Sequence, residues 1–261
     1  MSRDSWNPEL YARFRSERAQ PFHDLLALVR PRPGMRVADL GCGSGELTAL
    51  AHRQLGAQET LGVDSSAAML EKAAPLSGGG LSFARMDIAD FAASGAAPYD
   101  LVLSNAALHW LPDHPRLLAS LAALLAPGGQ IAVQVPANHG HPSHRLAHAL
   151  AGEEPFAHAL GGYARETTVL EAPDYAVLLH RLGFRAQHVR TQVYLHELEG
   201  PEGVVDWVRG TLLTDYERRL PAELWERYLQ AYRERLGALL GAERPYLYTY
   251  PRVLFWGALA R

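Results

Sequence analysis

The chain has 261 residues, of which 48% are hydrophobic and 20% charged, so it can build the core of one large domain and is not disordered overall. A net charge of −3 excludes the positive excess of a protein that binds nucleic acid or an anionic membrane. Its single cysteine excludes an intramolecular disulfide and a cysteine-based zinc site, and without an apolar stretch of the roughly 18 residues that span a membrane we expect a soluble, cytoplasmic protein.

Strand and helix patterns alternate through the first half of the chain. A helix is predicted over residues 8–30, before Pro31 and Pro33. The segments that then read as strands are 36–40, 60–63, 81–85, 99–104 and 130–135, and helical patterns lie between them at 46–55, 66–73 and 113–125. Apolar strands that alternate with helices predict a parallel sheet covered on both faces.

The alternation ends at Pro136. The later segments are a stretch rich in His, Gly and Glu at 137–180, a helix ending near 182, a strand at 184–195, a helical stretch at 200–245 and a last strand at 248–260. The long separation of the last two strands predicts an elaborated hairpin. We therefore expect helical insertions that form a cap near the carboxyl edge of the sheet, where open α/β sheets bind their ligands.

The strongest local signal is a glycine-rich turn between the first strand and the following helix. Gly41, Gly43 and Gly45 stand at alternate positions, and glycine allows a positive φ and the close approach of a ligand. Asp64 follows at the end of the next strand, where a carboxylate can accept hydrogen bonds from both hydroxyls of a ribose. Such a site serves either a dinucleotide or S-adenosylmethionine.

The spacing of the glycines favours S-adenosylmethionine. A dinucleotide-binding loop reads G-x-G-x-x-G, whereas this one reads G-x-G-x-G with Glu46 in the sixth position. The charge of Glu46 would lie where a pyrophosphate binds at a helix N-terminus. Asp39, two residues before the first glycine, can help to hold the cationic amino group of a methionine moiety.

Two later segments agree with this interpretation. After the third strand, Asp87 can accept the amino group of an adenine while Ile88 flanks the ring, although an acidic residue that caps a loop is a common alternative. After the fourth strand, the backbone of Asn105 and Ala106 would line the methionine and the transferring methyl group, ahead of His109.

In this order, the segments resemble the class I S-adenosylmethionine-dependent methyltransferases over residues 35–136. A narrower resemblance, to the trans-aconitate 2-methyltransferases, extends over nearly the whole chain. The stretches that carry it are Trp6-Asn7-Pro8, Tyr11, Phe14, Ser16-Glu17-Arg18, residues 38–43, 64–66, 105–106, Trp110-Leu111-Pro112-Asp113-His114, residues 132–134, Pro136, Asn138, residues 206–208 and Pro251-Arg252. His109 departs from the pattern, which has glutamine there, and residues 153–170 and 210–222 do not match.

The resemblance implies a Rossmann-like α/β fold with a mostly parallel, seven-stranded sheet, an antiparallel last strand and a helical cap. The expected parts are an N-terminal helical arm at 1–34, the S-adenosylmethionine-binding core at 35–136, a cap insertion at 137–183, and the last two strands at 184–261 with a helical cap insertion at 200–245.

The implied reaction is methyl transfer from S-adenosylmethionine to a carboxylate of trans-aconitate, which gives a monomethyl ester. A carboxylic acid with a pKa of about 4 is already ionised at pH 7, so it needs no general base, and we expect no catalytic residue. Positioning and the exclusion of water suffice. The expected partner is this small carboxylate substrate, bound by a monomer, with no nucleic acid and no membrane.

Two sets of residues are expected to bind the ligands. The cofactor set is Tyr11, Arg15, Asp39, Gly41, Cys42, Gly43, Gly45, Asp64, Ser65, Met69, Asp87, Ile88, Asn105, Ala106 and His109. The substrate set is Trp6, Arg18, Trp110, Asn138, Arg209 and Arg252. Arginines are natural partners of a tricarboxylate, and Arg252 leads because it begins the last strand within a matching stretch. Cys42 is expected to be a small packed residue rather than a nucleophile.

Four histidines allow a metal site as an alternative. They are His139, His141, His144 and His148. We expect no metal, because no acidic group accompanies them and methyl transfer needs none.

Three alternative functions remain open. The chain could methylate another small acid or a carrier-linked thioester, act as a nicotinamide-dependent oxidoreductase, or bind S-adenosylmethionine without catalysis. The glycine spacing disfavours the oxidoreductase. A nucleic-acid methyltransferase is disfavoured by the charge and by the lack of an Asn-Pro-Pro-Tyr segment after the fourth strand.

Overall fold

The computed structural model describes residues 15–95 and 98–260, with side chains from residue 19 onward. Its contacts define two compact units. In the described residues, we call one the sheet unit, made of residues 18–95, 98–136, 168–192 and 252–260, and the other the helical unit, made of residues 15–17, 137–167 and 193–251.

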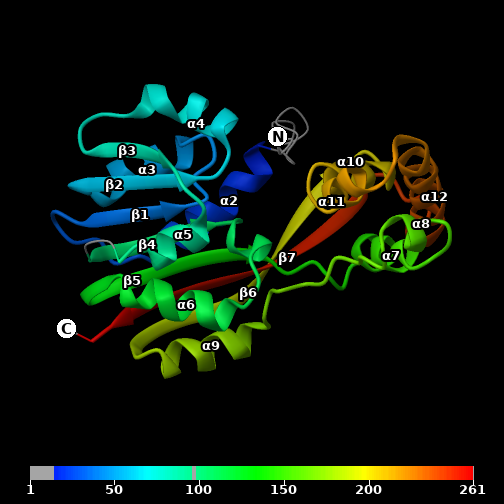
Figure 1. Ribbon diagram of the computed structural model, residues 1–261. Helices are drawn as coiled ribbons and strands as arrows, with labels where there is room; N and C mark the ends of the chain where they lie inside the picture. The colour runs from blue at the N-terminus through cyan, green and yellow to red at the C-terminus, as the bar shows by residue number, and fades with distance from the viewer. Residues whose placement is uncertain (1–14, 96–97, 261) are drawn as a thin grey trace. The chain divides into compact units, whose positions relative to one another are not determined.

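Within the described residues, seven strands form one sheet in the order β3-β2-β1-β4-β5-β7-β6 (Figure 1). The strands are β1 (Arg36–Leu40), β2 (Glu59–Asp64), β3 (Leu81–Arg85), β4 (Tyr99–Asn105), β5 (Leu125–Pro136), β6 (Phe184–Leu198) and β7 (Tyr246–Leu259). The first five pair in parallel, and β7 runs antiparallel to β5. The predicted mostly parallel sheet with an antiparallel last strand is confirmed.

The central strands are apolar on both faces because helices cover both. Leu101, Val102 and Leu103 are fully buried in succession along β4, as expected of a sheet between two helical layers. The helices of this unit are α2 (Arg15–Leu26), α3 (Glu46–Leu55), α4 (Ala67–Ala73), α5 (Ile88–Ala93), α6 (His114–Ala123) and α9 (Ala172–Arg181). In Figure 1, α5, α6 and α9 lie in front of the strands, while α2 and α3 lie behind them.

Most predicted elements occur within a few residues of their expected bounds, and the differences have local causes. The fifth strand begins at Leu125 rather than at Gln130, because Leu125 already pairs with Tyr99 before an irregularity shifts the register. Pro127, Gly128 and Gly129 therefore lie inside β5. Helix α5 was not predicted, since its six residues are too few to show helical periodicity.

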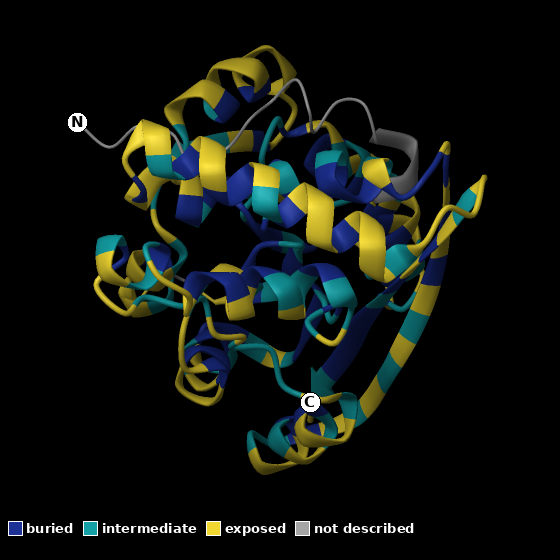
Figure 2. Cartoon of the chain, turned by 90° about the vertical axis from the view of Figure 1, so that its right-hand side faces the viewer, coloured by how far each residue is buried: buried dark blue, intermediate teal, exposed yellow. Residues whose placement is uncertain are grey.

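The helical unit has a core of its own. Its helices are α7 (Pro142–Ala151), α8 (Phe156–Ala159), α10 (Glu202–Arg209), α11 (Thr214–Arg219) and α12 (Ala222–Leu240). Buried and exposed residues are interspersed along the helices in Figure 2, which is the pattern of amphipathic elements. The described helices include none that is long and apolar enough to cross a membrane.

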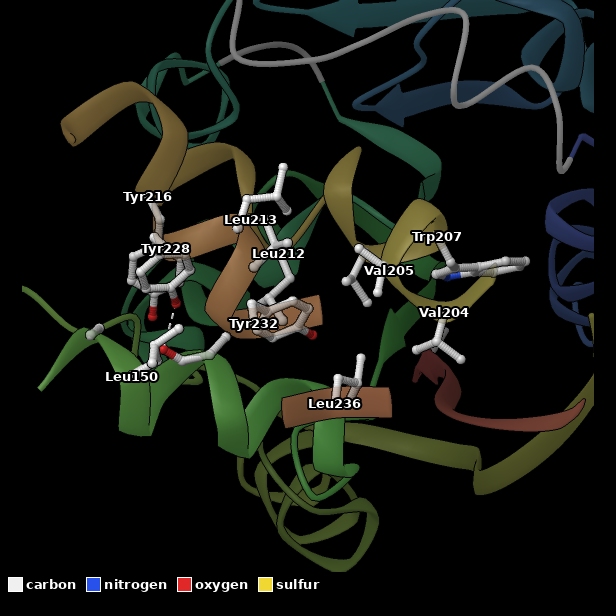
Figure 3. Close-up of a cluster of buried hydrophobic side chains, with 14 of the residues drawn as sticks. Leu150, Val204, Val205, Trp207, Leu212, Leu213, Tyr216, Tyr228, Tyr232 and Leu236 are labelled. Atoms are coloured by element: carbon white, nitrogen blue, oxygen red, sulfur yellow. Dashed lines mark hydrogen bonds between the residues drawn. The ribbon is translucent and has the colours of Figure 1, made fainter. Parts of the chain in front are cut away.

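Aromatic and aliphatic side chains pack together in this second core (Figure 3). The ring of Tyr228 stacks on those of Tyr216 and Trp225, with centroids 5.4 and 5.9 Å apart. The hydroxyl of Tyr228 donates to the carbonyl of Ala147 at 2.7 Å, and that of Tyr232 donates to the carbonyl of Ser143 at 2.8 Å. These two buried hydroxyls thus have partners, which offsets the cost of their removal from water.

Candidate functional site

The glycine turn joins the carboxyl end of β1 to the start of α3. A side chain at Gly41 would overlap the Cβ of Ala107, and one at Gly45 would lie 2.6 Å from the ring of Phe83. Both glycines have a φ of 74°, which disfavours any other residue. The turn therefore packs tightly against the segment after β4. At Gly43, by contrast, no described atom outside the adjacent residues lies within 4 Å of the position of a Cβ.

Asp64 ends β2, and its carboxylate joins two backbone segments. One oxygen accepts a hydrogen bond from the amide of Gly43 at 2.8 Å, and the other accepts from the amide of Ser66 at 2.9 Å. These bonds fix the carboxylate beside the glycine turn. Each carboxylate oxygen has a second lone pair, so Asp64 can still accept hydrogen bonds from a ligand.

Asp39 is a buried carboxylate inside β1. It is 4% exposed, and one of its oxygens accepts a hydrogen bond from the hydroxyl of Thr48 at 2.6 Å. The pKa of Asp39 is raised to about 6, chiefly by burial and also by the nearby charge of Asp64, while the hydrogen bond from Thr48 opposes the rise. A buried carboxylate with a neutral partner is costly when ionised, and a bound cation would relieve that cost.

The neighbours of the glycine turn come from β3, α4 and α5. Met69 is buried in α4, and the carbonyl of Ser65 accepts a hydrogen bond from Arg85 at 3.1 Å. Ile88 lies beside Gly41, since its Cδ1 would be 3.7 Å from a Cβ built there. Asp87 caps α5 by accepting from the amide of Ala89 at 2.8 Å, which is the capping alternative that the sequence left open.

Cys42 is half-buried in the glycine turn. Its Cβ would lie 3.1 Å from a Cβ built at Gly62, so the side chain packs closely against β2. Burial also raises the pKa of its thiol. A thiol that resists ionisation is a poor nucleophile, which agrees with its expected packing role.

The segment after β4 is held in a strained conformation. Ala106 has a φ of 54°, which is uncommon for a residue with a Cβ, and its amide donates to the carbonyl of Gln134 at 2.9 Å. The Oδ1 atom of Asn105 is buried and has no hydrogen-bond partner among the described residues. Strained backbone and an unsatisfied buried acceptor are typical of functional sites.

His109 and Trp110 follow on a short turn, η2 (Leu108–Trp110). Their rings lie 4.9 Å apart, and the side chain of Trp110 is 43% exposed. The carbonyl of His109 accepts a hydrogen bond from the hydroxyl of Thr168 at 3.4 Å.

Two residues that were not among the expected ligand-binding residues, His114 and Tyr175, support this turn. His114 contacts the carbonyl of Leu108 through Nε2 at 3.0 Å and the hydroxyl of Tyr175 through Nδ1. Tyr175 stacks on Phe255, with centroids 4.5 Å apart. Burial lowers the pKa of His114. The sequence could have indicated His114 only through the stretch Trp110–His114, which carries the family resemblance. It could not have indicated Tyr175, which lies far away in sequence.

Arg252 and Gln134 lie at the carboxyl end of β5. Arg252 is opposite Pro136 in the register of β5 and β7, is 5% exposed, and donates from Nη1 to Oε1 of Gln134 at 3.3 Å. Asn105 of β4 pairs with Gln134 of β5, so the two side chains project to the same face of the sheet. The structure thus brings Arg252 and Asn105 to one face at the same edge, with Gln134 between them.

Asn138 and Arg209 belong to the helical unit. Asn138 is buried and donates to the hydroxyl of Tyr248 at 2.8 Å, and Arg209 is half-buried in the last turn of α10. Trp6 and Tyr11 lie outside the described residues, whereas Arg15 and Arg18 begin α2 without described side chains.

Two of the four histidines form a polar network with Ser143. Its hydroxyl lies 2.8 Å from Nδ1 of His141 and 3.2 Å from Nδ1 of His144. Burial lowers the pKa of His141 to about 4 and that of His144 to about 3. His148 is exposed on α7. Over the part of the chain that the structure describes, no group of three or more His, Cys, Asp or Glu side chains could hold a metal ion.

Comparison with known proteins identifies the family. The profile of the methyltransferase domain family matches residues 11–189. A trans-aconitate 2-methyltransferase of Deinococcus radiodurans is 46% identical over 96% of this chain and 97% of that protein. Enzymes of the same name from Variovorax paradoxus and Streptomyces avermitilis are each 41% identical, over 88% and 95% of both chains. This chain belongs to the trans-aconitate 2-methyltransferase family.

Solved structures agree on the fold of this family member. The YcgJ protein of Bacillus subtilis superposes with a TM-score of 0.59 at 15% identity, over 93% of this chain and 99% of that one. A phosphoethanolamine N-methyltransferase of Haemonchus contortus, solved with S-adenosylhomocysteine, superposes with a TM-score of 0.54 at 15% identity, over 93% of this chain and 52% of that one. The chain is an S-adenosylmethionine-dependent methyltransferase, as the sequence predicted.

The residues at the sheet edge fit this cofactor. The buried carboxylate of Asp39 suits a cationic amino group, and the fixed carboxylate of Asp64 suits ribose hydroxyls. The open position at Gly43 leaves room beside the turn. The unsatisfied Oδ1 of Asn105 is an acceptor that faces no described donor.

Proposed function

We propose that this enzyme methylates a carboxylate of trans-aconitate and forms a monomethyl ester. The observation that carries the proposal is Arg252, a buried arginine at the carboxyl edge of the sheet, on the face that also carries Asn105. Guanidinium groups pair with carboxylates through two parallel hydrogen bonds. The identity to relatives named for this activity extends over nearly the whole chain, which supports the same acceptor.

The cofactor would be held by the sheet unit. We assign the amino group to Asp39, the ribose hydroxyls to Asp64 and Ser65, and the adenine to Asp87 and Ile88. When bound, S-adenosylmethionine supplies an electrophilic methyl group on a sulfonium. Gly41, Cys42, Gly43, Gly45, Met69, Asn105, Ala106 and His109 complete the proposed cofactor set, with Tyr11 and Arg15 from the N-terminal arm.

The acceptor needs positioning rather than deprotonation. Its carboxylate, with a pKa of about 4, is ionised at neutral pH, so no general base is assigned. Arg252 would bind this carboxylate, and Trp110 would help to exclude water. His114 and Tyr175 position the turn that carries Trp110. Trp6, Arg18, Asn138 and Arg209 complete the proposed substrate set.

A methyl-transfer assay across small di- and tricarboxylic acids tests this function. We expect trans-aconitate to be the best acceptor, with a product that releases methanol on mild alkaline hydrolysis, as an ester does. We also expect His109→Gln to remain active, because no base is needed. If no carboxylic acid in the panel is methylated, the proposed acceptor is wrong.

Arg252 variants test how the acceptor is bound. Arg252→Ala should raise the KM for trans-aconitate about 10- to 100-fold, because it removes a charge-assisted pair, and Arg252→Lys should restore binding only in part. Arg36→Ala is the matched control, since Arg36 lies at the amino end of β1 and pairs with Glu59 at 2.9 Å. An equal rise in KM for both arginine variants would contradict the assignment.

We further propose that the enzyme works as a monomer in the cytoplasm, with the four domain segments expected from its sequence. The small carboxylate substrate and the single cysteine support this setting, because cysteine-poor chains do not depend on an oxidising compartment. Light scattering at micromolar concentration measures the oligomeric state, and a mass of twice 28.7 kDa would contradict the monomer.

A further inference from the structure

The side-chain amide of Gln134 is buried, and of its two polar atoms only the oxygen has a hydrogen-bond partner among the described residues. It is fully buried, and its Oε1 accepts the hydrogen bond from Nη1 of Arg252. A guanidinium can only donate, so the amide oxygen must be the atom that faces Arg252. The Nε2 group is therefore the other end of the amide, and it has no hydrogen-bond partner among the described residues.

The position of Gln134 links the two sides of the site. Its backbone carbonyl accepts from the amide of Ala106, in the strained segment after β4. Its side chain reaches Arg252 on the opposite neighbour, β7. Gln134 thus lies between the segment assigned to the methyl donor and the arginine assigned to the acceptor.

The unsatisfied atoms on this face have opposite polarity. Oδ1 of Asn105 accepts hydrogen bonds, whereas Nε2 of Gln134 donates them. An acceptor suits the cationic end of the cofactor, and a donor beside a guanidinium suits an anion. A carboxylate placed between Nε2 and Arg252 would satisfy the buried amide.

A second glutamine on the same strand, Gln130, forms hydrogen bonds within the fold at both ends of its side-chain amide. Gln130 lies on the same face, four residues earlier in β5. Its Oε1 accepts from the amide of Arg30 and from Nε1 of Trp256, both at 2.9 Å, and its Nε2 donates to the carbonyl of Arg30 at 2.8 Å. Both ends of the Gln130 amide are used within the fold, whereas one end of the Gln134 amide is not.

We propose that Gln134 and Arg252 together bind the carboxylate of the acceptor. Gln134 acts twice, because its oxygen orients the guanidinium and its Nε2 donates to a carboxylate oxygen. This assignment rests on the proposed function and adds a residue that contacts the substrate and selects for an anion. A substrate without a negative charge would leave Nε2 of Gln134 unsatisfied and would gain no charge-assisted hydrogen bond from Arg252, so the pair discriminates against it.

Two substitutions separate recognition from structure. Gln134→Glu keeps the size of the side chain but places a second carboxylate against Arg252, which occupies the guanidinium and repels the acceptor. Gln134→Met removes both hydrogen bonds without adding charge. We expect the KM for trans-aconitate to rise about 100-fold or more with Glu and about 10-fold with Met, while the Kd for S-adenosylhomocysteine stays unchanged in both.

Gln130→Glu is the matched control, with the same substitution on the same strand and face. It should lower thermal stability and leave the KM for trans-aconitate unchanged. A structural role for Gln134 predicts a different result, in which Met is at least as harmful as Glu and the Kd for S-adenosylhomocysteine rises together with the KM. That result would overturn the proposal, as would a KM for Gln134→Glu equal to that of the wild type.

The proposed function fails separately. If the wild type methylates no carboxylic acid, the acceptor class is wrong whatever the variants do. The pair can then still be tested by calorimetric binding of trans-aconitate to the enzyme loaded with S-adenosylhomocysteine. Binding that Gln134→Glu weakens would support the pair, and absent or unweakened binding would overturn it.

Discussion

Two sets of buried polar side chains, one in each unit, differ in how their hydrogen bonds are satisfied. In the core of the helical unit, Tyr228 and Tyr232 each donate a buried hydroxyl to a specific backbone carbonyl. At the carboxyl edge of the sheet unit, the side chains of Asn105 and Gln134 each keep a buried atom without a described partner. Because an unsatisfied buried group costs free energy, the difference indicates that the first region is built for stability and the second for a ligand.

The largest effect on stability is expected from a cavity in the helical unit. Leu213 is fully buried in the core of the helical unit, so Leu213→Ala should lower the free energy of unfolding by about 2–5 kcal/mol. Urea denaturation measures the change. Leu239→Ala is the control, because Leu239 is 61% exposed and should change stability by less than about 0.5 kcal/mol. If folded Leu213→Ala lost affinity for S-adenosylhomocysteine, the core of the helical unit would have a role in ligand binding as well as in stability.

Gly41→Ala should damage both stability and cofactor binding. The new Cβ overlaps that of Ala107 at a positive φ, so we expect a loss of roughly 2–4 kcal/mol in unfolding free energy and weaker binding of S-adenosylhomocysteine. The control is Gly56→Ala, at a φ of 57° with no contact for its Cβ. It should show only the smaller backbone penalty. Equal losses in the two variants would mean that the close approach at Gly41 has no role.

Asp39→Asn should stabilise the ligand-free enzyme and weaken its cofactor binding. The folded pKa of about 6 exceeds the ordinary 3.8, so the folded state holds its proton more tightly. Stability from this group is therefore complete below pH 4 and is lost as the pH rises to 6, by about 3 kcal/mol. The asparagine variant should gain up to this amount at pH 8 and nothing at pH 4. Thermal unfolding across this range, with and without S-adenosylhomocysteine, tests both halves of the prediction.

The smallest effect is expected from Tyr228→Phe. The change removes the hydroxyl that donates to Ala147 and should lower the free energy of unfolding by about 1 kcal/mol, with methyl transfer unchanged. An altered KM for trans-aconitate would show that the network of the helical unit is more than a stabilising one.

Local patterns were sufficient to predict much of the sheet and the turn that we assign to the cofactor. The apolar strands, the G-x-G-x-G turn and Asp64 are close in sequence, and their spacing follows from strand length and turn geometry. The predicted strands Arg36–Leu40 and Leu81–Arg85 and the helix Glu46–Leu55 have these bounds in the structure. Short elements such as α5 lacked a periodic signal, and Asp87 showed its capping role only when the helix start was visible.

By itself, the sequence determined the class of fold, the cofactor and the family, because each depends on residues within one strand-turn-helix unit or on a continuous match. Only the tertiary structure decided which distant side chains meet. Gln134 and Arg252 are 118 residues apart, and His114 and Tyr175 are 61 apart, so no local pattern could pair them. Whether a buried amide is satisfied also depends on neighbours from other strands, and this separated Gln134 from Gln130.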